Sequence, residues 1–276
     1  RHALLRHLQP RTSLLEFSPL EARLMMGGVE KGIVSRIYKS LISNATDSFS
    51  HIRKRWESWV GAFEEDEWAM IRMVPKEIAI SAKLRIIQFN VLHLAYLSPD
   101  RLSHMDNPAA SRCARCHLHK ADFFHMVWSC PHVRSFWREV EQEISQVLEA
   151  TISLSPITAL LGLLERVGRR KGERTFIGIA TMIAKRDIAS KWNQSLAPTL
   201  VEWRKGMDWC AILEKPIYEA RGCPEKFNRI WSSWLEYHGL PNEIRHTTNH
   251  AIWHCLPKLE IVNNIIPKCS VSKYSN

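Results

Sequence analysis

The chain has 276 residues, and hydrophobic residues make up 45% of them, enough to bury a core and to exclude wholesale disorder. Lys and Arg number 38 against 28 Asp and Glu, which gives a formal charge of +10. A basic balance of this size favours phosphate-rich partners, because each neutralised phosphate releases condensed counterions, although ordinary solubility charge gives the same count.

The first 77 residues divide into a lead-in and a helical segment. Residues 1–28 show weak patterning and are predicted to be poorly ordered, whereas residues 29–77 contain helical patterns at 32–43 and 52–68. The second pattern holds Trp56, Trp59 and Trp68. Such rings can pack inward while their N–H groups reach polar partners. The acidic run at 64–67 is expected to be a solvated face or a loop, because no histidine or matching acid nearby would complete a metal site.

Residues 78–150 are predicted to form the region around a cluster of cysteines. Leu84, Ile87, Val91 and Leu94 recur at helical spacing and predict a helix over 78–97, which Pro99 closes. A polar connection over 98–112 leads to the cysteines. Another helix is predicted from Pro131 to about residue 150, and its apolar stripe consists of Val133, Phe136, Val140, Ile144 and Val147.

Residues 151–238 are predicted to form a C-terminal helical region. Helices are expected at 156–166 and 174–196, separated by the glycine-flanked basic run 168–172. Thr199 and Glu202 make a capping box for a helix to about residue 220, and a further helix is expected at 225–237. Little periodicity follows, so residues 239–276 are predicted to be a disordered tail. No alternating run makes a convincing strand, and the predicted fold class is therefore all-α.

The seven cysteines are best interpreted as reduced thiols. The opening sequence RHALLRHL is too briefly apolar for a secretory signal peptide, and the apolar stretch at 176–184 is too short to span a bilayer. The chain is therefore predicted to be intracellular and without a membrane partner, with thiols that bind metal or lie buried. The first residue is Arg rather than Met, which suggests a fragment of a longer product.

One constellation carries metal chemistry: Cys113, Cys116, His125 and Cys130. Two cysteines three residues apart can converge on one ion from a tight turn, and a histidine and a cysteine five apart can complete the site from the start of the next helix. Three thiolates and one imidazole suit Zn²⁺, and a filled four-coordinate shell is structural. Spacing favours His125, while His117, His119 and His132 remain alternative ligands. The prediction is a helical array with a small Cys-Cys-His-Cys zinc-binding loop between two long helices, with a short hairpin allowed at the metal site.

The cluster lies within a longer pattern. It includes RIIQFNVLH at 85–93, SPDRL at 98–102, HMVWSCP at 125–131 and FW at 136–137. Residues 81–137 closely resemble the C-terminal region of the reverse transcriptase polyprotein of LINE-type non-LTR retrotransposons. Weaker likeness at 32–38, 184–192, 198–203 and 225–234 extends the resemblance to about residues 30–237.

The resemblance implies a function in nucleic-acid binding. In that family this segment is implied to bind RNA and to help assemble the cytoplasmic and nuclear ribonucleoprotein that copies the element, with the polymerase portion of the parent polyprotein as a partner. The spacing of the cysteine loop departs from the retroviral knuckle, which has four residues between its second Cys and its His. Sequence-specific RNA reading is therefore not carried over.

Catalytic motifs are missing from the sequence. The chain contains no Asp-Asp pair of a polymerase and no Gly-Lys-Ser or Gly-Lys-Thr of a phosphate-binding loop. The His-x-Glu and Pro-Cys-x-x-Cys pattern of zinc deaminases is also missing, since Arg112 precedes Cys113. The expectation is a non-catalytic fragment.

Basic and aromatic residues near the cysteines are the candidate nucleic-acid contacts. Aromatic rings can stack on unpaired bases, although Trp128 and Phe136 are expected to pack in the core instead. A second basic run lies at 166–174 and a third at 51–55. The candidate residues for RNA or single-stranded nucleic acid are Arg112, Arg115, Lys120, Phe123, Arg134, Arg138, Arg169, Arg170 and Lys171.

Two other hypotheses compete with nucleic-acid binding. In the first, zinc braces a helical protein–protein scaffold whose Trp-rich helices dock onto the polymerase core or a host factor. In the second, the chain is the non-functional remnant of a decayed element. Basic residues converging around the metal favour nucleic acid, and an apolar Trp patch favours the scaffold.

Overall fold

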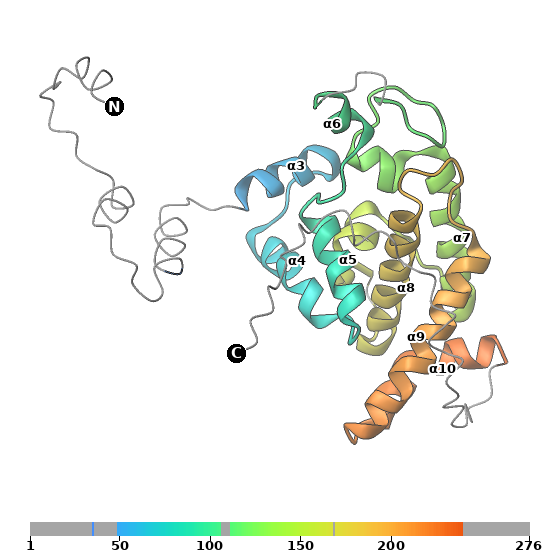
Figure 1. Ribbon diagram of the computed structural model, residues 1–276. Helices are drawn as coiled ribbons and strands as arrows, with labels where there is room; N and C mark the ends of the chain where they lie inside the picture. The colour runs from blue at the N-terminus through green and yellow to red at the C-terminus, as the bar shows by residue number, and fades with distance from the viewer. Residues whose placement is uncertain (1–34, 36–48, 106–110, 168, 240–276) are drawn as a thin grey trace, which may run out of the picture. The chain divides into compact units, whose positions relative to one another are not determined.

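The computed structural model describes Ser35 and residues 49–105, 111–167 and 169–239 (Figure 1). Contacts divide the chain into two compact units, residues 1–51 and 52–276. Only a few residues of the first unit are described, so the account that follows concerns the second. The predicted lead-in, the predicted helix at 32–43 apart from Ser35, and the predicted tail from residue 240 lie outside the described residues.

The described part of the chain consists of helices and connecting turns, with no strand, which confirms the all-α class. The hairpin allowed near the cysteines is a hydrogen-bonded turn rather than paired strands. Within it, the Cys113 N–H donates to the Leu118 carbonyl at 2.9 Å, and the Ala121 N–H donates to the Ser111 carbonyl at 3.2 Å.

Two helices replace the single pattern predicted at 52–68. Helix α3 covers Ser50–Val60 and helix α4 covers Glu65–Glu77. They are separated at Gly61, which has φ +92° and thus a left-handed conformation that glycine adopts without strain. The acidic run lies at the start of α4, where Glu64 and Glu67 form a capping box, and carboxylates there favour the positive end of the helix.

The next helices frame the cysteine cluster. Helix α5 (Ala82–Leu92) is shorter than the predicted 78–97, because Ser81 is its N-cap and Leu94, at φ +54°, cannot continue it. Helix α6 (Pro99–Ser103) follows, with the Ser98 side chain accepting from the Arg101 N–H. Helix α7 (Pro131–Val147) matches its prediction, and the whole predicted apolar stripe from Val133 to Val147 is buried.

The C-terminal region contains two irregular turns and three helices. The predicted helix at 156–166 is a π-helical turn, η3 (Ile157–Leu161), and a 3₁₀ turn, η4 (Leu164–Val167), which Gly162 separates with φ +76°. Helix α8 (Lys171–Ser190) begins inside the predicted basic loop. Helix α9 (Leu200–Ala220) has the predicted Thr199–Glu202 capping box, and helix α10 (Pro224–Tyr237) follows.

Helix α8 is the centre of the core. Its residues Phe176 to Lys185 are all buried, and it packs against α5, α9, α10 and η3. The predicted segment boundaries at 77/78 and 150/151 fall inside this one unit. No helix in the described ranges is both long enough and apolar enough to cross a membrane.

Most of the described tryptophans pack as predicted, with the ring inward and the N–H bonded to a polar partner. The indole N–H of Trp56 donates to the Leu92 carbonyl at 2.9 Å, and that of Trp203 donates to the Ala180 carbonyl at 2.9 Å. These bonds satisfy a polar group that would otherwise be costly to bury. The buried tryptophans are Trp56, Trp68, Trp128, Trp137, Trp192, Trp203, Trp231 and Trp234.

A lysine lies in the middle of this core. The Lys185 side chain is 2% exposed, and its ammonium donates to the Gln88 side-chain oxygen, to the Ala159 carbonyl at 2.8 Å and to the Leu160 carbonyl at 3.3 Å. Ala159 and Leu160 belong to η3. Burial lowers the pKa of Lys185 to about 7.

Candidate metal centre

A tight turn presents the first two cysteines. The His117 N–H donates to the Cys113 carbonyl at 2.8 Å, which brings Cys113 and Cys116 to the same side of the turn. His117 and Lys120 have positive φ values, 59° and 53°, so the chain reverses sharply after Cys116. The sequence pattern Cys-x-x-Cys thus folds as the local geometry of metal knuckles requires.

The other two candidate ligands flank the turn before α7. The Asp122 carboxylate accepts from the His125 backbone N–H at 2.7 Å, and a π-helical turn, η2 (His125–Ser129), carries the chain to Cys130. The Cys130 N–H donates to the His125 carbonyl at 2.9 Å, which closes the turn, and Pro131 begins α7. Asp122 was not predicted, although an Asp three residues before His125 is a recognisable capping signal.

The four ligand atoms converge. The sulfurs of Cys113, Cys116 and Cys130 and a ring nitrogen of His125 all lie within 4.8 Å of one another. The Cys113 and Cys130 sulfurs are 4.0 Å apart, and the Cys116 sulfur lies 3.3 Å from His125 Nε2. A tetrahedral ion with metal–sulfur bonds of about 2.3 Å and a metal–nitrogen bond of about 2.05 Å would separate two sulfurs by about 3.8 Å and a sulfur from a nitrogen by about 3.6 Å. The Cys113–Cys130 and Cys116–His125 separations lie within about 0.3 Å of these values, and every other pair of ligand atoms lies within 4.8 Å.

Burial and backbone dipoles set the chemistry of these groups. Burial lowers the pKa of His125, which favours the neutral imidazole, the form that binds a metal. Burial acts to raise the pKa of Cys113, but hydrogen bonds from the backbone N–H groups of Cys116 and Arg115 outweigh it, and the net pKa is lowered. Burial raises the pKa of Cys130 to about 11, against the pull of N–H groups in the first turn of α7.

Arg115 is a correction to the predicted nucleic-acid contacts. Its residue is 5% exposed, and its guanidinium points inward. It donates to the Met126 carbonyl at 3.2 Å and to the Lys191 carbonyl, just beyond α8, at 2.8 Å. Burial lowers its pKa, whereas the nearby cysteine thiols act to raise it. Arg115 therefore joins the cysteine turn to the end of α8 and is not available to a phosphate.

The aromatic candidates are also internal. Phe123 is 5% exposed, so it is corrected from base stacking to packing, and it lies against Trp59. Phe124 is half-buried and stacks on Trp59 with ring centres 5.4 Å apart. Trp128 and Phe136 are buried, as predicted.

The basic residues around the cysteine turn differ from Arg115. Arg112, Lys120 and Arg138 are exposed, and none forms an ion pair with any residue that the structure describes. Arg134 is half-buried, and its guanidinium lies 4.4 Å from the ring centre of Trp128. The three histidines that remained alternative ligands, His117, His119 and His132, are exposed and stand apart from the four-residue group.

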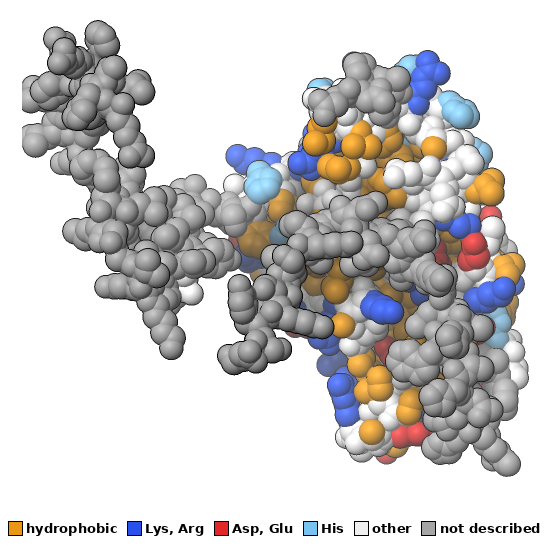
Figure 2. Space-filling model, viewed as in Figure 1, with side chains coloured by type: hydrophobic (Ala, Val, Ile, Leu, Met, Phe, Trp, Pro, Cys, Tyr) orange, Lys and Arg blue, Asp and Glu red, His pale blue; other side chains and the backbone are white. Residues whose placement is uncertain are grey.

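The second basic run is largely paired. Arg169 bonds to Glu173 at 2.6 Å, Arg166 bonds to Glu67 at 2.6 Å, and Arg174 lies 3.6 Å from Glu165. Arg170 and Lys171 of this run are exposed. On the face drawn in Figure 2, Lys and Arg side chains stand in several separate groups between hydrophobic and histidine side chains.

The fold and the site define an all-α protein with a group of three cysteines and one histidine that can hold a metal ion. With four protein ligands, such a centre has no open position at which water would be activated. No family model matches the chain.

Proposed function

We propose that the four-residue group binds Zn²⁺ and that the ion is structural. Three thiolates and a neutral imidazole are the donor set that zinc prefers, and the atom spacing suits a tetrahedron. The ion would fix a zinc-binding loop, residues 111–130, between the helices that precede it and α7. Arg115 supports this role, because its hydrogen bonds tie that loop to the end of α8.

We further propose that the zinc-binding loop and the first turns of α7 form a surface for RNA or another single-stranded nucleic acid. The proposal rests on a difference in ion pairing between two groups of basic residues. Arg112, Lys120 and Arg138 have no acidic partner among the described residues, whereas Arg166, Arg169 and Arg174 each have one. Cations that are exposed and unpaired can neutralise phosphates without first losing an ion pair.

The resemblance of residues 81–137 supports a more specific identity, and its most specific part is the same four-residue group. In this proposal the chain is a non-catalytic C-terminal fragment of a LINE-type retrotransposon reverse transcriptase. It acts in ribonucleoprotein assembly and reverse transcription beside the polymerase portion of the parent polyprotein. Cytoplasm and nucleus are the places where such a particle works.

The test joins metal content to RNA binding. Native mass spectrometry of the full chain should find one zinc ion. Fluorescence anisotropy with a labelled ten-nucleotide oligouridylate should give an affinity that falls steeply with salt, and Arg138→Gln should reduce the slope of log K against log salt by about 0.7. Arg169→Gln is the matched control, because this cation is already paired with Glu173. No binding at 0.05 M salt, or equal effects of the two variants, would overturn the proposed surface.

One observation favours the scaffold as a second candidate. Val201, Trp209 and Leu213 are exposed on α9 at spacings of eight and four residues, which places them on one face of the helix. The variant Trp209→Ser, Leu213→Ser should abolish binding to a purified polymerase portion if that face is the docking surface, and it should leave RNA affinity unchanged.

A further inference from the structure

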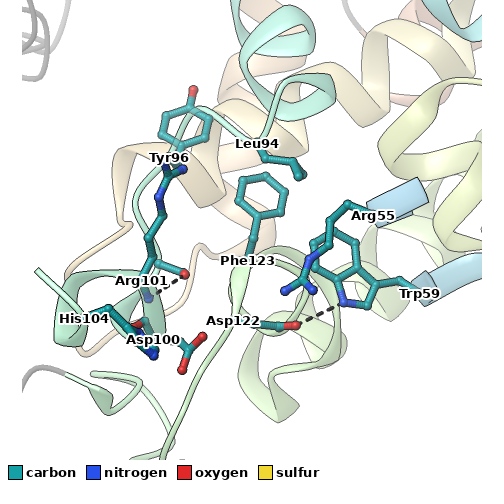
Figure 3. Close-up of a pocket in the computed structure, with 10 residues that line it drawn as sticks. Arg55, Trp59, Leu94, Tyr96, Asp100, Arg101, His104, Asp122 and Phe123 are labelled. Carbon is teal, nitrogen blue, oxygen red and sulfur yellow. Dashed lines mark hydrogen bonds between the residues drawn. The ribbon is translucent and has the colours of Figure 1, made fainter. Parts of the chain in front are cut away.

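A pocket of about 280 Å³ lies beside the zinc-binding loop. Figure 3 shows Arg55 and Trp59 of α3 entering it from one side, Tyr96 and Arg101 from the other, and Phe123 between them. This volume lies just below the roughly 300–1,000 Å³ of small-molecule sites, so the pocket can take at most one nucleotide and not a longer segment.

The wall on the α3 side is a pre-formed stack of planar groups. The Phe124 ring lies on Trp59 with centres 5.4 Å apart, and the Arg55 guanidinium lies over Trp59 at 4.7 Å from its ring centre. The Trp59 N–H donates to the Asp122 carboxylate at 3.1 Å, which fixes the ring. Nucleobases stack on aromatic rings and on Arg guanidinium planes, so an unpaired base can stack on this layer.

The opposite side supplies charge. Arg101 of α6 is exposed and forms no ion pair within the described part of the chain, so its five N–H donors are available to a phosphate. Asp100 also lines the pocket and can accept only, which suits the N–H groups on the edge of a base. Both oxygens of Asp122 are already occupied, one by Trp59 and the other by the His125 N–H. The negative charge of this carboxylate disfavours a second phosphate beside it.

We propose that this pocket binds one unpaired nucleotide of a single-stranded RNA, with the base against the Arg55–Trp59 layer and a phosphate at Arg101. The inference rests on the proposed RNA-binding function and names the pocket in which one nucleotide of the RNA binds. An apolar ligand would leave two arginines without partners, and an acidic peptide would not use the planar stack. The basic run at 51–55 includes Arg55, but neither this run nor residues 98–102 alone predicts the site, since it joins three separate segments.

The experiment uses the full zinc-loaded chain and the labelled ten-nucleotide oligouridylate. Arg101→Gln removes one exposed cation and should weaken binding about fivefold at 0.1 M salt, with the salt slope reduced by about 0.7. Arg229→Gln, an exposed cation on α10, is the control and should change affinity less than twofold. The second measurement is the indole N–H signal of Trp59 in a ¹⁵N–¹H spectrum, assigned with Trp59→Phe, which should shift as the oligonucleotide binds.

The outcomes separate this inference from the function beneath it. If the oligonucleotide binds, yet Arg101→Gln matches Arg229→Gln and the Trp59 signal stays still, the pocket assignment is overturned and RNA binding stands. If the oligonucleotide does not bind at 0.05 M salt, both the pocket assignment and the proposed RNA binding are overturned. Uridine monophosphate should move the same signal only at concentrations at least tenfold higher. Equal affinities for the two would identify a free-nucleotide pocket and overturn the assignment to a strand.

Discussion

Lys185 should make the stability of this protein rise with pH above neutrality. The folded pKa is about 7 and the unfolded pKa is 10.5, so between these values the unfolded chain binds a proton that the folded chain does not. Stability rises with pH wherever the unfolded state binds more protons. For these two pKa values the gain from pH 7 to pH 8.5 is about 1.6 kcal/mol. Below pH 7 both states are protonated, and the contribution levels off.

The assay is urea unfolding followed by far-UV circular dichroism at pH 7.0, 7.5, 8.0 and 8.5, for the natural chain and for Lys185→Met. The variant removes the lysine donor from the Ala159 carbonyl and leaves the Leu160 carbonyl with the Gln88 amide alone, so its absolute stability can move either way. Its pH dependence is the informative quantity, and it should be lower by about 1.6 kcal/mol over this range. Thiol titration near pH 8.5 is common to both proteins and cancels in the difference between them, and burial raises the pKa of Tyr218 to about 12, above the range. Identical slopes for the two proteins would refute the reasoning.

Three further predictions follow from the site and the core. Cys130→Ser should lose the bound metal and lower the melting temperature by more than 10 °C, because structural zinc contributes on the order of 10 kcal/mol; Cys223→Ser, outside the metal group, should do neither in the same calorimetric and metal-content measurements. Arg115→Met should cost about 3 kcal/mol in urea unfolding, because three carbonyls lose their donor, and a loss no greater than that of the exposed Arg112→Met would contradict the buried role. Glu143→Gln should lower the free energy of unfolding by about 2 kcal/mol. The Glu143 side chain is 3% exposed, and its two oxygens accept from Arg204 at 2.7 and 2.6 Å. Glu139→Gln is the control and should change the free energy of unfolding by no more than about 0.5 kcal/mol in the same urea measurement.

Features that depend on neighbouring residues were predictable. The Thr199–Glu202 capping box and the Pro131 start of α7 are local patterns, and both helices occur where they were predicted. The metal group was predictable for the same reason, since all four ligands lie within 18 residues of chain and the spacing limits how they can fold. Short sequence patterns therefore predicted the helix starts and the grouping of the four ligands, because each depends on residues close together in the chain.

Features that depend on distant residues were missed. Arg115 lies in a basic stretch typical of a binding surface, but its guanidinium bonds to Lys191, 76 residues away. Helix α5 ends before Leu94, which has a left-handed backbone conformation, and a leucine in the sequence does not predict such a conformation. Gly162 ends η3 in a left-handed conformation and divides a predicted helix, and the η3 carbonyl of Ala159 accepts from Lys185 on α8. A charged side chain in a helical pattern does not reveal whether its partner is water or a carbonyl from another element.

Asp122 links the candidate metal centre to the proposed nucleotide pocket. One of its oxygens accepts from the backbone of His125, a candidate ligand, and the other accepts from the indole of Trp59, which forms the pocket wall. Because the metal group consists of three cysteines and a histidine, this carboxylate is not consumed as a ligand and stays free to position both neighbours. An ion that holds His125 in place therefore also holds the ring on which Arg55 lies. A four-coordinate ion without an open position suits such a role, since the metal would act by fixing the positions of Asp122 and Trp59 beside the surface proposed to bind RNA.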